Sequence, residues 1–213
     1  MELEQNETFE IKGPQLEVLG QAESKLPAPA RKRPVAVLFL AVMIAVSVFG
    51  IGGARLKGKY NNVVSIYTEE SDRHGNGIQG DFSVQMDNAA NLTRQCQKIL
   101  GQDSAECAAV SGLVAQWETT PRTPSAQYEI ITRLNGAVDA MYSAAKAAAR
   151  GEDLDRVEGL DANYVSTQSI LEREIAQNYT TAAQEYNQLA GSFPASLIAP
   201  LWGAGEAELF AAP

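Results

Sequence analysis

The residue types that most often carry chemistry are scarce in this 213-residue chain. Its single histidine, His74, stands in the glycine-rich run 74–80, which predicts a solvated surface position. One histidine cannot build a multi-histidine metal site, and together with Cys96 and Cys107 it would still lack the fourth ligand of a zinc site. We therefore expect neither a histidine-dependent triad nor a metal centre.

The two cysteines, Cys96 and Cys107, allow two interpretations. If residues 101–104 form a turn, both lie at equal height on adjacent helices and can form a disulfide, which would indicate an oxidising compartment. If the helix runs straight, its rise separates the cysteines by about 16 Å, beyond the roughly 7 Å between Cα atoms that a disulfide bridges. In that case they are small buried hydrophobes.

Acidic residues cluster at Glu69, Glu70 and Asp72, and again at Glu152, Asp153 and Asp155. Di-metal sites in helical bundles use Glu-x-x-His pairs, which this sequence lacks. The second cluster is typical of a helix start, where carboxylates interact favourably with the helix dipole. No Gly-x-Ser-x-Gly motif and no complete Gly-x-x-x-x-Gly-Lys-Ser/Thr phosphate loop occurs. We expect no catalytic, cofactor-binding or metal-binding residues, and no enzymatic activity.

The net charge is acidic, at −9, and residues 55–213 contain twenty acids against twelve bases. Nucleic acids favour basic grooves, so we expect no nucleic-acid partner. An acidic surface promotes solubility and discourages flat binding to anionic lipid.

Residues 35–54 read VAVLFLAVMIAVSVFGIGGA and contain no charge. A bilayer core of roughly 30 Å requires about 20 apolar residues in a helix, so this run is just sufficient. A cleaved signal peptide is the alternative, because residues 50–54 are small; its apolar region is usually only about 7 to 15 residues long, however. We expect a transmembrane helix over 34–54, with the lipid bilayer as the partner of 35–54.

The segments that flank this helix predict its orientation. Residues 1–33 form a tail of mixed acids and bases with too little apolar surface to order itself. The tail ends in Arg31-Lys32-Arg33, whereas Arg55, Lys57 and Lys59 follow the helix. By the positive-inside rule, we expect a single-pass protein of the cell membrane with a cytoplasmic N-terminus and the main domain outside.

Beyond the membrane segment, apolar residues recur at steps of three and four, which predicts helices with one buried face. The four seams are Phe82, Met86, Ala89, Thr93, Cys96 and Leu100; Cys107, Val110, Val114 and Trp117; Ile131, Leu134, Val138, Met141, Ala145 and Ala148; and Leu171, Ile175, Ala182, Tyr186 and Leu189. Such seams are found in coiled coils and helical bundles. The predicted fold is all-α, with the transmembrane helix followed by an antiparallel bundle of long helices over 55–213.

Helix breaks are also visible in the sequence. The run 121–124 contains two prolines, after which Ser125 is suited to cap the next helix. Gly151 ends that helix, Pro194 ends the last one, and the glycines of 74–80 interrupt the first. The membrane helix is expected to continue through Tyr60.

Several motifs, taken in order, resemble the LemA family of membrane proteins. A Tyr-Asn pair follows the anchor at Tyr60-Asn61, and residues 87–92 resemble the family's Asp-Leu-Ile-Pro-Asn-Leu segment. Near the C-terminus come Tyr186-Asn187, Phe193-Pro194, Leu197-Ile198-Ala199 and Phe210, which match the family's Tyr-Asn, Phe-Pro, Leu-Ile-Ala and terminal aromatic. No single motif is specific, but their order agrees over most of residues 35–210.

The chain departs from that family in several ways: it lacks the tryptophan after the first Tyr-Asn, it lacks Arg-Arg before Asp87, and it has Ala90 in place of the proline. In addition, the segment from Leu160 to Tyr179 looks shortened, and the long acidic tail before the anchor is atypical. It is therefore similar to a divergent member. The resemblance implies a bacterial source and a membrane-anchored helical bundle without known enzymatic activity. It also favours a continuous helix through the region of Cys96 and Cys107, with both as buried hydrophobes.

The apolar segment 196–210 is the remaining candidate for a partner surface. It either folds back on the bundle or presents an exposed patch to a protein partner, a second copy or a membrane surface. Two interpretations are also open for the motif residues: they have a structural role, or they form a binding patch for a partner. These residues are Tyr60, Asn61, Tyr186, Asn187 and Phe193. The predicted function is a membrane-anchored scaffold or interaction protein without catalytic activity, whose cellular role the sequence does not define. The alternative is an extracytoplasmic small-ligand sensor that acts through a partner protein.

Overall fold

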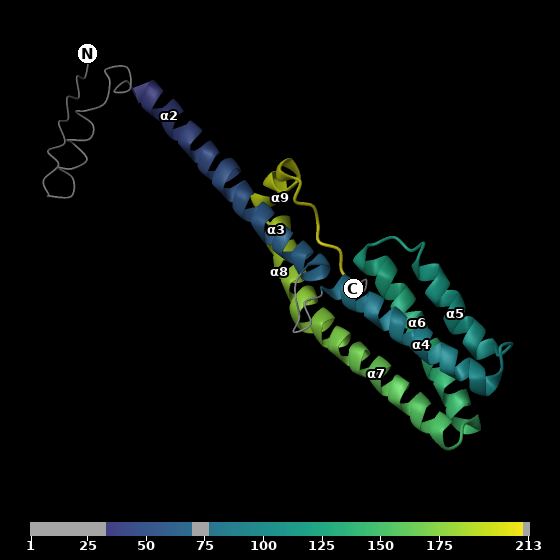
Figure 1. Cartoon of the computed structure of the whole chain (residues 1–213). Coiled ribbons are helices and arrows are strands. Elements are labelled where there is room, and N and C mark those ends of the chain that lie inside the picture. Colours follow the sequence, from purple (N-terminus) through teal and green to yellow (C-terminus); the bar gives the residue numbers. More distant parts are fainter. Residues whose placement is uncertain (1–32, 70–76, 211–213) are drawn as a thin grey trace, which may run out of the picture. The chain divides into compact units, whose positions relative to one another are not determined.

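A computed structural model describes residues 33–69 and 77–210, and within these ranges every regular element is a helix (Figure 1). The predicted all-helical class is therefore confirmed. Nearly all of the N-terminal tail, together with Glu70, Asp72 and His74, lies outside the described residues. The chain divides into two compact units, Met1–Gly52 and Gly53–Pro213.

The first unit contains α2 (Arg33–Ala45) and a π-helical segment, η2 (Val46–Gly52). Large apolar side chains of α2 are exposed along its length, including Leu38, Phe39 and Leu40. Helical backbone continues to Thr68, and this helix, Pro34–Thr68, is the single one in the described ranges that is long and apolar enough to cross a membrane. The length and composition expected for a span are thus present, and helix is confirmed through Tyr60.

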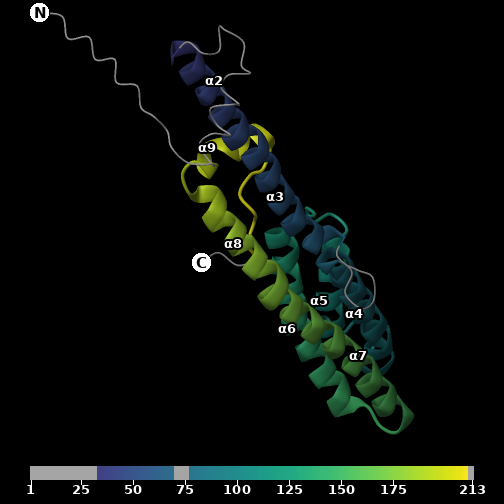
Figure 2. The ribbon, with the colours of Figure 1, turned by 90° about the vertical axis from the view of Figure 1, so that its left-hand side faces the viewer.

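The second unit, referred to below as the body, contains the remaining helices. They are α3 (Gly53–Thr68), α4 (Ile78–Leu100), α5 (Ala105–Trp117), α6 (Pro124–Ala148), α7 (Glu152–Glu174), the π-helical η3 (Ile175–Tyr179), α8 (Thr180–Gly191), α9 (Ala195–Ile198) and the 3₁₀ turn η4 (Pro200–Trp202). The helix α4 contacts α3, α5, α6 and α7, and α3 also contacts η3, α8, α9 and η4 (Figures 1 and 2). The C-terminal elements therefore pack at the end of the body where α3 begins.

The core consists mainly of the predicted seams. On α4, Phe82, Ala89 and Cys96 are completely buried, and on α6 the same holds for Leu134 and Val138. Burial of each such side chain contributes roughly 1.5–3 kcal/mol relative to exposure. The periodic apolar residues are therefore the main source of stability for these contacts.

Ala148, the last residue of the α6 seam, is exposed, and three further local predictions from the sequence are wrong. The helix does not run straight from Cys96 to Cys107: Gly101 has φ = 94°, which favours glycine, and the Ser104 hydroxyl accepts a hydrogen bond from Cys107 N and caps α5. Ser125 is not the cap of α6, because Thr123 holds that position and Pro124 is the first helical residue.

The third error concerns the last seam, where Ala182 is only partly buried and Leu189 is exposed. The buried residues are instead Leu171, Ile175, Tyr179, Ala183 and Tyr186. The π-helical turn η3 adds a residue to the helical repeat and so moves the buried face by one position.

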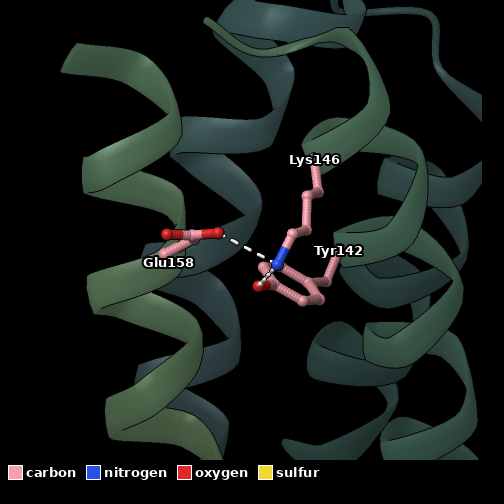
Figure 3. A network of polar contacts seen from close by, with 3 residues as sticks. All are labelled: Tyr142, Lys146 and Glu158. Atoms are coloured by element: carbon pink, nitrogen blue, oxygen red, sulfur yellow. Dashed lines mark hydrogen bonds and ion pairs between the residues drawn. The ribbon is translucent and has the colours of Figure 1, made fainter. Parts of the chain in front are cut away.

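One exposed ion pair joins α6 and α7 (Figure 3). Lys146 Nζ lies 2.9 Å from Glu158 Oε1 and donates to the Tyr142 hydroxyl at 3.2 Å. The hydrogen bond to Glu158, followed by that to Tyr142, raises the pKa of Lys146. Because both charges are in contact with water, this network adds little to stability compared with the buried seams.

Candidate functional site

The acidic residues predicted for the helix start are found there. Glu152, Asp153 and Asp155 lie in the first turn of α7, and Asp153 accepts a hydrogen bond from Gln95 Nε2 at 3.1 Å. In the ranges 33–69 and 77–210, no three His, Cys, Asp or Glu side chains gather as a metal site would require. This cluster therefore has a structural explanation.

The spacing of a phosphate loop does occur at Gly53-x-x-x-x-Gly58-Lys59, but Tyr60 follows where such a loop has Ser or Thr. All of these residues are helical in α3. A phosphate loop requires non-helical backbone before its helix, so this segment cannot form one.

Cys96 and Cys107 are both completely buried free thiols on the neighbouring helices α4 and α5. Desolvation, followed by the proximity of Cys107, raises the pKa of Cys96 to about 12. The thiol is therefore protonated at neutral pH and behaves as a small hydrophobe. The turn between the cysteines agrees with the first interpretation of the sequence, whereas the free, buried thiols agree with the second.

A polar contact joins three core helices. Asn135 Oδ1, on α6, accepts hydrogen bonds from Gln85 Nε2 of α4 at 2.8 Å and from the Tyr164 hydroxyl of α7 at 2.6 Å. Gln85 and Tyr164 are completely buried, and burial raises the pKa of Tyr164. This contact links α4, α6 and α7 through one acceptor atom, while the buried Gln85 Oε1 has no hydrogen-bond partner among the described residues.

The most elaborate set of contacts holds residues 203–210, here called the C-terminal strap. The Tyr186 hydroxyl donates to Gly205 O at 2.8 Å. Asn187 binds both backbone groups of Ala207: its Nδ2 donates to the carbonyl oxygen, and its Oδ1 accepts from the amide, each at 2.8 Å. The side chains of α8 thus replace the backbone partners that the extended strap would otherwise lack.

The strap ends in Phe210, whose side chain is buried among aromatic rings of several helices. Its ring centroid lies 4.6 Å from that of Tyr179, 5.5 Å from that of Tyr128 and about 6.0 Å from those of Tyr67 and Phe82. The tilted and edge-on geometries are those that aromatic quadrupoles favour. Burial of Ile198, Ala199, Ala204, Ala207 and Phe210 shows that much of segment 196–210 folds back on the body.

The start of the strap is fixed against α3. Lys57 Nζ donates to Gly203 O at 2.7 Å and lies 4.8 Å from the centre of the Tyr60 ring, which in turn packs against Tyr186. Just before the strap, the indole of Trp202 touches Gly53 so closely that a Cβ atom there would lie 1.9 Å from its Nε1 atom. The first Tyr-Asn pair and the C-terminal motifs therefore meet, through Tyr60, at one place.

Not all of these motif residues have the same environment. Asn61 is exposed, whereas Asn187 binds the strap. Asn91 bonds to Arg94 of its own helix rather than to another helix. The role of Lys57 was not predicted, because nothing in the spacing of a lysine indicates a distant carbonyl partner.

Four large apolar side chains remain exposed where the chain turns from α8 into the strap. They are Phe193, Leu197, Leu201 and Trp202, with exposed fractions of 83%, 60%, 74% and 41%. We call this set the apolar corner. Segment 196–210 therefore both folds back and presents an exposed patch.

Hollows also occur away from the strap on the described part of the body, among them the following two. One of about 270 Å³ is lined mainly by polar residues, including Thr68, Ser83, Glu118, Arg122 and Gln127. The other, of about 460 Å³, lies between α4 and α5 and is lined in part by Ala90, Val114 and Ala115.

The described fold and its surfaces define a class: a helical body, closed by a C-terminal strap, that follows a candidate membrane span. Comparisons with protein-family models, curated proteins and solved structures find no match to this chain.

Proposed function

We propose that this protein is a single-pass, membrane-anchored scaffold or interaction module without catalytic activity. The observation that carries the proposal is the uncharged helical run of residues 35–54, most of whose large apolar side chains are exposed, directly followed by a helical body. An uncovered apolar helix of this length is stable in hydrocarbon, where its backbone groups are satisfied internally.

The body is proposed to be an antiparallel, coiled-coil-like bundle of the LemA type, from a divergent bacterial member. Support comes from where the motif residues lie. Tyr60, Tyr186 and Asn187 hold the strap, directly or through one another, and Phe210 inserts into the core. These motif residues, which resemble those of the LemA family, therefore share one structural role, which is to hold the C-terminal strap against the body.

The proposed location is the cell membrane, with the N-terminus in the cytoplasm and the body outside. The bases at 31–33 directly before the span support this orientation. It can be tested by replacing the exposed Ser111 with cysteine and labelling intact cells with a membrane-impermeant maleimide. Labelling that requires cell lysis would reverse the proposed orientation.

Membrane anchoring is tested by alkaline carbonate extraction and flotation of the Leu40→Arg/Ile44→Arg variant. Two charges inside the span should move the protein out of the carbonate-resistant fraction, because charges at the bilayer centre are costly. The matched control is Val64→Arg, since Val64 is also exposed but lies beyond the span, on α3. Wild-type protein that extracts fully with carbonate would contradict the anchor.

The scaffold role is tested by crosslinking in intact membranes followed by mass spectrometry. Recovery of a specific protein partner, or of a second copy, is expected. Its absence, combined with ligand-dependent melting of the protein, would replace the scaffold by the second candidate.

That second candidate is a small-ligand sensor acting through a partner protein. The polar hollow of about 270 Å³ favours it, because Arg122 and several hydroxyl and amide groups converge there. A metabolite screen by thermal melting should then give a shift that Arg122→Gln abolishes and Arg133→Gln, a change on exposed α6 surface, leaves intact.

A further inference from the structure

The apolar corner is confined to a short stretch of the chain. Leu197 lies in α9, Leu201 and Trp202 lie in η4, and Phe193 stands just before these two short helical turns. No charged residue occurs from 186 through 205. Large apolar side chains grouped in this way usually mark an interaction surface.

The inner side of the same turns is fixed to the body. Ile198 and Ala199 are buried, Ala204 N donates to Ala199 O at 2.9 Å, and both α9 and η4 contact α3. Packing and hydrogen bonds on the buried side of these turns therefore hold the exposed side chains in place. The apolar corner is an ordered part of the body.

Trp202 connects the apolar corner to the end of the proposed span. Its indole touches the backbone of Gly53, and Gly53 is bonded to Gly52, which belongs to the uncharged run 35–54. A run of this length only just crosses the hydrocarbon, at about 1.5 Å per residue, so the proposed span places residue 53 near the level where hydrocarbon meets headgroups. A side chain in contact with residue 53 is then also close to that level.

The chemistry around Trp202 fits that depth. Tryptophan is enriched at membrane interfaces, because its ring is apolar while its N–H remains polar. Arg55 and Lys59 are exposed on the following turns of α3, where cationic groups can meet lipid phosphates, and Lys57 is bound to Gly203 O. Apolar side chains, an indole and nearby cations are the composition of an interfacial anchor.

We propose that Phe193, Leu197, Leu201 and Trp202 insert into the interface of the same bilayer that holds the span. The proposal rests on the proposed membrane anchoring and adds a second attachment point to it. The sequence alone was equally compatible with a protein partner for this surface. We assign it to lipid because the surface adjoins the end of the proposed span and is therefore close to the bilayer. Two attachments restrict the tilt of the body, which one helix alone leaves free.

The two tryptophans of the chain, Trp117 and Trp202, allow a direct test. The full-length Trp117→Phe protein, whose fluorescence comes from Trp202 alone, is reconstituted into phosphatidylcholine vesicles that contain lipid brominated near the headgroup end of the acyl chain. Emission from Trp202 is expected to fall roughly twofold or more relative to unbrominated vesicles, as for an interfacial indole. Leu201→Glu in the same background should largely restore the emission, because a charge draws the corner out of the interface.

The matched control places a tryptophan on another exposed apolar position. Val165 lies on α7, which Figures 1 and 2 show well apart from α9, and its side chain is 44% exposed. The Trp117→Phe/Trp202→Phe/Val165→Trp protein should show the same emission in both kinds of vesicle.

Flotation after carbonate treatment separates the two proposals. If the protein floats but Trp202 is not quenched, the interfacial attachment is overturned while the anchor stands. Acrylamide then distinguishes the remaining occupants: protection of Trp202 indicates a second copy or a protein partner, and access indicates solvent. If the protein does not float, the anchor itself is overturned and the interfacial attachment with it.

Discussion

At the scale of single residues, two identical dipeptides have different roles. Tyr60-Asn61 and Tyr186-Asn187 share a sequence, yet only the second asparagine binds the strap. The difference arises because Asn187 faces an extended segment with free backbone groups, whereas Asn61 is on the exposed side of α3. A motif therefore predicts a residue type, while the fold decides what it contacts.

Replacing Asn187 with alanine should destabilise the protein by about 1–3 kcal/mol, because both backbone groups of Ala207 lose their partner. Thermal or urea unfolding of full-length protein in detergent, followed by circular dichroism, measures this. Asn61→Ala is the matched control and should change stability by less than about 0.5 kcal/mol. Equal effects of the two substitutions would show that the strap does not depend on Asn187.

The cysteines give a second prediction at this scale. With the pKa of Cys96 raised to about 12 and both thiols buried, alkylation of native protein at pH 8 should be about a hundredfold or more slower than of unfolded protein. Ser111→Cys, on the exposed side of α5, should react rapidly in the native state. Fast native labelling of Cys96 or Cys107, followed by mass spectrometry, would show that α4 and α5 open readily.

At the scale of elements, the sequence predicted the helices whose apolar residues recur regularly, but not the irregular turns that shift this spacing. Steps of three and four identified most of the buried residues of α4, α5 and α6, because burial is the requirement that produced the spacing. On α5, however, Leu113 is buried while Val114 and Trp117 are only partly buried. The π-turn η3 could not be predicted, since an added residue shifts the pattern without changing its composition. The strap could not be predicted either, because its hydrogen bonds join side chains to backbone groups far away in the sequence.

The π-turn is expected to be essential for the strap. Deleting the exposed Gln177 removes the extra residue, rotates α8 by about 100° relative to α7, and turns Tyr186 and Asn187 away from residues 203–210. Limited proteolysis should then cleave the strap, whereas Gln177→Ala, which keeps the register, should leave it protected. A protected strap in the deletion variant would mean that α8 tolerates the rotation.

Gly53 is a further element-scale prediction, because it lets α3 and the turn η4 approach closely. A Cβ atom there would overlap the Trp202 indole, whereas a Cβ atom at Gly58 of the same helix meets nothing within 4 Å. Gly53→Ala should displace Trp202 and shift its emission in the Trp117→Phe background. Gly58→Ala should leave the emission unchanged and slightly stabilise α3.

At the scale of the whole molecule, the core of the body carries several groups whose ionisation opposes folding. Burial raises the pKa of Tyr67 and Tyr164, and raises that of Tyr179 and of Cys96 to about 12. In the unfolded chain these groups ionise near their ordinary values, 10.0 for tyrosine and 9.0 for cysteine. Stability is therefore complete below about pH 9 and is lost as the pH rises towards 12, because the unfolded state releases protons first.

Alkaline titration of the full-length protein in detergent should show this coupling. The melting temperature is expected to fall steadily above about pH 9, and tyrosinate absorbance should rise only as helicity is lost. Tyr179→Phe should reduce the slope, since it keeps the ring against Phe210 but removes one ionising group, at the cost of the hydrogen bond to Glu208 O. Tyrosines that ionise near pH 10 while the helices remain intact would show that the aromatic cluster around Phe210 is open to water, and the strap would then not be the closure of the body.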